Sequence, residues 1–205
     1  MDTRFSQKLL FLLIICSMLL PALLRSQGGY TYVGAEKCKK CHSDYSIGNQ
    51  YGIWLSSPHA RAKQTLSSEK ALRIAGNHSV KNPAESRFCL RCHTTGGGNS
   101  PLTMDEGVGC EACHGAASGY YTAGNHVNLL YRDRGYATAV KNGMYPIRGI
   151  DSLKKRERLC MSCHTDKRPC VPEDRGNRKR QGISLQVIDK LRKGSIDISH
   201  PLRRY

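Results

Sequence analysis

Four copies of one short pattern of cysteine and histidine stand along this sequence of 205 residues. In each copy two residues separate two cysteines, and a histidine directly follows the second cysteine. Cysteines at this spacing can add to the two vinyl groups of a porphyrin as thioethers, and the histidine can bind the iron from the proximal side. The pattern therefore indicates attachment of c-type haem. The cysteine pairs are Cys38 and Cys41, Cys89 and Cys92, Cys110 and Cys113, and Cys160 and Cys163, followed by His42, His93, His114 and His164.

Paired cysteines at this spacing also occur in zinc sites, in redox-active dithiols and in disulfide frameworks. Neither tetrahedral zinc geometry nor disulfide pairing requires a histidine directly after the second cysteine, and here one follows in all four copies. We therefore expect four haem c groups as cofactors, in preference to a pair of cysteine-rich zinc sites.

The ligand on the opposite side of each iron decides what the haem does. A strong second ligand makes a low-spin electron carrier, whereas a vacant position leaves room for a small molecule such as nitric oxide. Met104 and Met144 are alternative ligands that would raise the reduction potential, or they pack against porphyrin edges. Any single histidine is by default a surface residue. Beyond the four proximal residues the sequence has four further histidines, His59, His78, His126 and His200.

The composition bears on the fold class. Hydrophobic residues make up 39% of the sequence, so a conventional core would be thin. No strand pattern of any length stands out. We expect a mainly α fold with long loops in which the haems form the core, and an apoprotein that is largely unfolded.

The first 27 residues are typical of an export segment. Arg4 and Lys8 give a charged start, and residues 9–24 are apolar apart from Ser17. This predicts a signal peptide or an uncleaved N-terminal anchor over residues 1–27, with a haem-bearing domain over residues 28–205. We therefore expect the protein in the periplasm or at the outer face of the cytoplasmic membrane.

Local signals predict the helices that must position these side chains. Pro58 is typical of the first turn of a helix, so we expect His59 near the start of that helix. Ser67 is the expected N-cap of a second helix. His126 falls in a glycine-rich loop after the third motif. Helices are expected from Pro58 onward within residues 51–64, and over residues 67–75, 151–159 and 184–193.

The run Gly107-Val108-Gly109-Cys110-Glu111-Ala112-Cys113-His114-Gly115, together with Trp54 before His59-Ala60-Arg61-Ala62, supports a more specific comparison. These segments resemble the family of tetrahaem cytochromes c that take electrons from hydroxylamine oxidoreductase in ammonia-oxidising bacteria. The resemblance spans residues 34–164, with a looser match to the expected C-terminal helix. It implies a multihaem cytochrome c fold and an electron-transfer role.

The resemblance also implies which histidines complete the irons, because distal ligands in that family come from distant segments. Such crossed ligation ties the chain together through iron. The implied pairs are His59 with His114, His126 with His42, and His200 with His164.

The haem on His93 is five-coordinate in the resembled family, and nitric oxide reduction has been proposed there. His78 has no counterpart in the family pattern and can reach this iron as a distal ligand. Its alternatives are a loop histidine or a pH-responsive neighbour of the haem.

The charge predicts the kind of partner. The formal net charge is +16, and residues 1–27 account for three basic residues and one acidic one. Haem propionates lower the charge of the mature protein, but it stays roughly +6 to +10. We expect redox partner proteins that are acidic at the docking face, and an anionic membrane surface is a further candidate. Nucleic acid is not expected, since basic residues are not interleaved with aromatics.

Cys170 is the cysteine that neither the motifs nor the export segment uses. We expect a small buried residue between Pro169 and Pro172, with an intermolecular disulfide or a redox role as alternatives.

Three functions fit these observations. The first, which we favour, is an extracytoplasmic electron carrier that is not an enzyme and holds mostly bis-histidine haems. The second is an oxidoreductase that reduces nitrogen oxides at a five-coordinate haem on His93. The third is a subunit of a conductive cytochrome filament, in which a neighbour donates one distal histidine.

Overall fold

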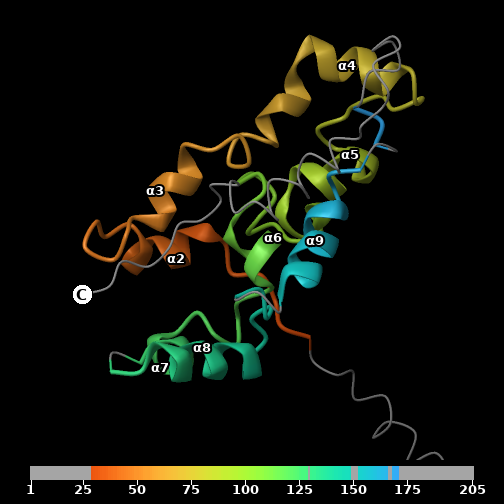
Figure 1. The fold of residues 1–205 in the computed structure, drawn as a ribbon. Helices are drawn as coiled ribbons and strands as arrows, with labels where there is room; N and C mark the ends of the chain where they lie inside the picture. Colours follow the sequence, from red (N-terminus) through yellow and green to blue (C-terminus); the bar gives the residue numbers. More distant parts are fainter. Residues whose placement is uncertain (1–28, 129, 149–151, 166–167, 171–205) are drawn as a thin grey trace, which may run out of the picture. The chain divides into compact units, whose positions relative to one another are not determined.

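The computed structural model describes residues 29–128, 130–148, 152–165 and 168–170. The chain divides into two units, Met1–Tyr30 and Thr31–Tyr205, and every described helix belongs to the second (Figure 1). The α-helices are α2 (Ala35–His42), α3 (Gln50–Leu55), α4 (Glu69–Gly76), α5 (Arg87–His93), α6 (Cys110–His114), α7 (Ala123–His126), α8 (Arg132–Lys141) and α9 (Leu153–Met161), and the short 3-10 helices are η1 (Gln64–Ser67) and η2 (Thr95–Gly98).

The expectation of a mainly α fold with long loops is confirmed, because the described residues form helices and no strand. The longest helix in the described residues, α8, has 10 residues. No helix in the described ranges has the length and apolar character needed to cross a membrane. The expected helix over residues 184–193 and the expected export segment over residues 1–27 lie outside the described residues.

Two local expectations were wrong in detail. The segment from Pro58 forms turns instead of a helix, and the neighbouring helix α3 ends at Leu55. The N-cap of α4 lies one residue later than expected, because the side chain of Ser68 and not that of Ser67 accepts a hydrogen bond from the Ala71 amide, at 3.2 Å.

The apolar core of the described residues is small. Within the described ranges only eight hydrophobic residues are buried, and four of them are alanines. One cluster joins Ala117, Tyr120 and Ala139, with Val33 and Met144 packed against it. Met144 thus contributes to the protein core. Side chains of this size bury little area, so the core alone contributes modestly to stability.

A buried carboxylate joins the start of the second unit to the third haem motif. Glu111, within that motif, is 2% exposed. Its oxygen atoms accept hydrogen bonds from the backbone amides of Val33, Gly34 and Ala117 at 2.7–3.1 Å. The carboxylate therefore holds the segment before the first motif against the third motif.

Replacing Glu111 with alanine is expected to destabilise the protein by about 3 kcal/mol or more, because three buried amides lose a charged acceptor. Chemical denaturation of the haem-loaded variant measures this. Glu69→Ala serves as the control, since the Glu69 side chain is 94% exposed in its ion pair with Arg73 and its loss should change stability by less than about 1 kcal/mol. Equal stability of the two variants would contradict the role given to Glu111.

Candidate functional site

Each of the four motifs lies in helical backbone. The first three coincide with the C-terminal parts of α2 and α5 and with the whole of α6. In the fourth, α9 ends at Met161, but the amide of His164 still donates to the carbonyl of Cys160 at 2.8 Å. On a helix, residues three and four apart share a face, so the two cysteines and the histidine of each motif point to the same side.

The motif thiols are free, and thiols of different motifs meet in pairs. None of the described cysteines forms a disulfide bond. Cys38 and Cys110 share a hydrogen bond, which lowers the pKa of Cys38 and raises that of Cys110. Cys92 and Cys163 share another, which lowers the pKa of Cys163 to about 6 and raises that of Cys92. The first motif therefore lies beside the third, and the second beside the fourth.

Hydrogen bonds at Nδ1 orient three of the imidazole rings. The Nδ1 of His42 lies 3.1 Å from Gln50 Oε1, that of His93 lies 2.8 Å from the carbonyl oxygen of Ala62, and that of His126 lies 3.0 Å from a backbone carbonyl. Since these partners are acceptors, each Nδ1 carries a proton and donates it. A histidine that donates from Nδ1 uses Nε2 as its metal-binding atom, which is the usual arrangement of a histidine that binds a metal.

Two pairs of imidazole rings face each other at a separation that suits a shared iron. The rings of His42 and His126 have centroids 6.3 Å apart and an interplanar angle of 23°. The rings of His59 and His164 are 5.9 Å apart at 80°. Metal–nitrogen bonds of about 2.0 Å on opposite sides of one ion put two imidazole centroids about 6 Å apart. The two centroid separations therefore match that of two axial imidazoles on one haem iron.

Burial favours the form of these rings that binds metal. Desolvation lowers the pKa of His59. Desolvation, with the nearby charges of His59 and Arg168, lowers the pKa of His164. Both imidazoles are therefore biased toward the neutral state, which offers a lone pair to a metal.

The structure places the two rings of one implied ligand pair side by side, and it places a different ring beside His59. His126 lies against His42, as implied. His59 lies against His164, whereas the resemblance pairs it with His114. The carbonyl of His59 accepts from the Val108 amide at 2.9 Å, which fixes its backbone just before the third motif while its ring extends to the fourth. His200 lies outside the described residues, so its implied pairing with His164 is not described.

His78 is exposed and packs against Phe88, with ring centroids 5.5 Å apart. Its ring thus contacts Phe88, the residue before Cys89. Among the interactions of the described residues, none joins His78 to His93. His78 therefore lies close to the second motif, but its ring packs against that of Phe88.

The backbone positions of His59 and His126 depend on close approaches at glycines. At Gly107, with φ of +73°, a Cβ would lie 2.5 Å from the carbonyl oxygen of His59. At Gly135 in α8, a Cβ would lie 2.8 Å from the carbonyl oxygen of His126. Neither place has room for a side chain. The helix α8, which no sequence signal had indicated, thus helps to hold His126.

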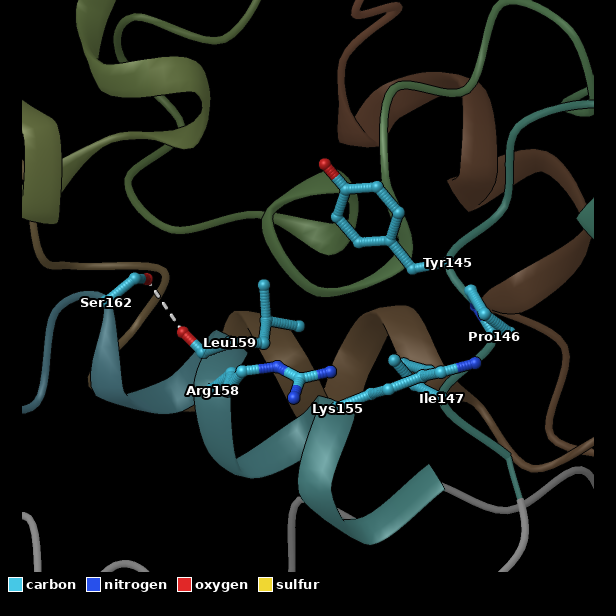
Figure 2. A pocket seen from close by; sticks show the side chains of 7 residues that line it. All are labelled: Tyr145, Pro146, Ile147, Lys155, Arg158, Leu159 and Ser162. Atoms are coloured by element: carbon cyan, nitrogen blue, oxygen red, sulfur yellow. Dashed lines mark hydrogen bonds between the residues drawn. The ribbon is translucent and has the colours of Figure 1, made fainter. Parts of the chain in front are cut away.

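A pocket of about 340 Å³ lies along the helix α9 that carries the fourth motif (Figure 2). Figure 2 shows Leu159 and the ring of Tyr145 on its walls, with the basic side chains of Lys155 and Arg158 beside them. Apolar walls with two cations suit the edge of a porphyrin and its two propionates. The donor set and this lining fit haem, with the motif thiols as attachment points and the paired imidazoles as ligands.

The expectation that Cys170 is buried was wrong. The residue is exposed in a turn after Pro169. Its thiol hydrogen-bonds to the His93 ring, an interaction that lowers the pKa of Cys170 and raises that of His93. The spacing of residues along the chain gave no sign of this contact, because 76 intervening residues separate the two positions.

Comparisons with known proteins agree with this chemistry. The family model for cytochrome c554 and c-prime matches residues 37–115, which include the first three motifs. Cytochrome c-554 of Nitrosomonas europaea is 28% identical over 174 residues, which cover 75% of this chain and 68% of that protein. No solved structure matches. Residues 37–115 are therefore similar to the cytochrome c554 and c-prime family, a likeness that agrees with the attachment of haem c.

Proposed function

We propose that the chain is an extracytoplasmic electron carrier with four covalent haem c groups and no substrate of its own. Residues 1–27 direct export or anchor the chain, and residues 28–205 form the haem-bearing domain. Support comes from the four motifs in helical backbone and above all from the two facing imidazole pairs. Two axial imidazoles saturate an iron, which then exchanges electrons and binds no substrate.

In this proposal each iron has a proximal ligand from its own motif. His126 completes the iron on His42, and His59 completes the iron on His164. A six-coordinate iron takes one distal ligand, so His200 cannot also bind the iron on His164 when His59 does. The facing rings favour His59.

The contacts between motif thiols suggest the order of the haems along the electron route. Cys38 meets Cys110, and Cys92 meets Cys163, as described above. Cys113 is close enough to Cys160 and Cys163 for their charges to raise its pKa, together with the larger effect of burial. These neighbours suggest a chain of haems from His42 to His114, then to His164, and finally to His93.

The basic charge supports a redox partner that is acidic at its docking face. With residues 1–27 removed the polypeptide keeps a formal charge of +14, since that segment holds three basic residues and one acidic one. Charge of this size raises the rate at which an oppositely charged partner meets the protein.

The distal ligands can be tested one at a time on haem-loaded protein. His126→Ala and His59→Ala should each convert one of the proposed four irons from low to high spin, because each removes one axial imidazole. Electron paramagnetic resonance of the oxidised protein measures the loss. His78→Ala is the matched control and should leave all spin states unchanged. Full low-spin signal in His126→Ala would refute the pairing with His42.

Gly107→Ala tests the backbone support of His59. The added Cβ meets the His59 carbonyl, and alanine is disfavoured at positive φ, so we expect a loss of roughly 1–3 kcal/mol in stability. Displacement of His59 should also give one high-spin iron. Gly76→Ala is the control, because nothing lies within 4 Å of a Cβ there. Unchanged spectra and stability in Gly107→Ala would contradict this role.

The charge argument predicts opposite salt effects for two small redox reagents. Oxidation of the reduced protein by an anionic metal complex should slow as ionic strength rises, because salt screens the attraction. Oxidation by a cationic complex should accelerate. Stopped-flow rates over a range of salt concentrations measure both, and the reverse pattern would rule out a basic docking surface.

A further inference from the structure

Exposed apolar side chains gather at the turn between α7 and α8. Val127, Leu130 and Tyr131 fall within five positions of the chain and are 44%, 84% and 53% exposed. Leu130 is the most exposed large hydrophobic side chain of the described residues. Single apolar residues at a surface are ordinary, whereas apolar residues gathered at one place mark an interaction site.

Basic side chains continue this surface along α8. Arg134 and Lys141 are exposed, and their spacing puts them on the same face of the helix as Tyr131. The guanidinium carbon of Arg134 lies 4.3 Å from the centroid of the Tyr131 ring, in a cation–π contact that holds both side chains in place. Aromatic and arginine side chains supply much of the binding energy at protein interfaces. The α8 surface is the set Val127, Leu130, Tyr131, Arg134 and Lys141.

The charge around this surface decides which kind of molecule it fits. Residues 116–148 contain four arginines and lysines but a single acidic residue, Asp133. The Asp133 carboxylate lies 2.7 Å from the Arg148 guanidinium. The α8 surface therefore presents apolar side chains with positive charge beside them. A second copy of the chain would bring cations against cations, whereas a protein with acidic residues around an apolar centre would be complementary.

The α8 surface also lies at one end of the suggested electron route. The helix α8 packs against α7 (Figure 1), and Val127 directly follows His126, whose ring faces that of His42. A molecule seated on this surface would therefore stand beside the ligand pair of the haem proposed on His42. Electron exchange between proteins requires cofactors that approach closely, and it is served by small, short-lived interfaces.

We propose that the α8 surface is the docking site of an acidic redox protein that exchanges electrons with this chain next to His42 and His126. The inference rests on the proposed function, which it deepens by assigning the partner to one face. The partner gives or takes one electron, and this chain takes or gives the same electron. No bond forms or breaks, and no proton needs to move.

The test uses haem-loaded protein and a plant-type ferredoxin, a small acidic iron–sulfur protein, as the reduced probe. Stopped-flow measurements at low salt give the rate constant for electron transfer. Arg134→Glu should lower it about tenfold or more, because the variant repels the acidic probe. Leu130→Ser should lower it several-fold, since an apolar contact is lost.

Two variants of α4 make the same chemical changes elsewhere. Arg73 and Leu72 are exposed, with 72% of the Arg73 side chain and 51% of Leu72 accessible. Arg73→Glu and Leu72→Ser should each change the rate constant by less than about twofold. Equal rates in Arg134→Glu and Arg73→Glu would overturn the docking site.

Cross-linking of the unmodified protein gives a second test that needs no variant. A carbodiimide couples carboxylates of the bound ferredoxin to nearby lysines, and peptide mass mapping locates the coupled residues. We expect coupling at Lys141 and none at Lys70, which is exposed on α4. Coupling that avoids Lys141 and occurs at Lys70 would refute the inference.

Photoreduced deazariboflavin, a small uncharged reductant, separates this inference from the proposed function. Haems that it cannot reduce would count against the proposed function, whereas normal reduction leaves the ferredoxin results to judge the docking site. Binding to phosphatidylserine vesicles that Leu130→Ser abolishes would assign the surface to a membrane instead. Dimers of the unmodified protein that Leu130→Ser dissociates would assign it to a second copy, and either result would overturn the inference.

Discussion

The scarcity of apolar side chains to bury is the constraint on which the rest of this structure depends. Half of the buried hydrophobic residues in the described part of the chain are alanines, and long loops join helices of ten residues or fewer. Such elements bury too little area to offset the conformational entropy of ordering them. In the proposed function the porphyrins supply that missing surface, so the cofactors that carry electrons also complete the interior.

Iron ligation and polar contacts would then share the task of joining distant segments. His126 and His59 stand 84 and 105 residues from the proximal histidines that they face. Glu111 adds a link through the protein itself, since its carboxylate holds backbone amides 77 and 78 residues away. The close approach at Gly107 fixes the backbone of His59. In the proposed function, these contacts thus fix the backbone from which His59 and His126 would reach an iron.

The four motifs could be recognised from the sequence, because covalent attachment of haem c requires this spacing of cysteine and histidine. The helix near Ser67 was also predictable to within one residue, since its signals are local. The sequence did not predict the turns after Pro58, the helix α8 or the ring that lies beside His59. Each depends on contacts with remote backbone, such as the one between His59 and Val108. The exposure of Cys170 and its contact with His93 depend in the same way on tertiary structure.

Amide hydrogen exchange tests most directly whether the cofactors form the interior. The natively matured protein would be compared with a haem-free chain in which serine replaces the eight motif cysteines. The account predicts strong protection of α2, α5, α6 and α9 in the matured protein, and exchange close to that of an unfolded chain without haem. Equal protection of these helices in the haem-free chain would contradict it.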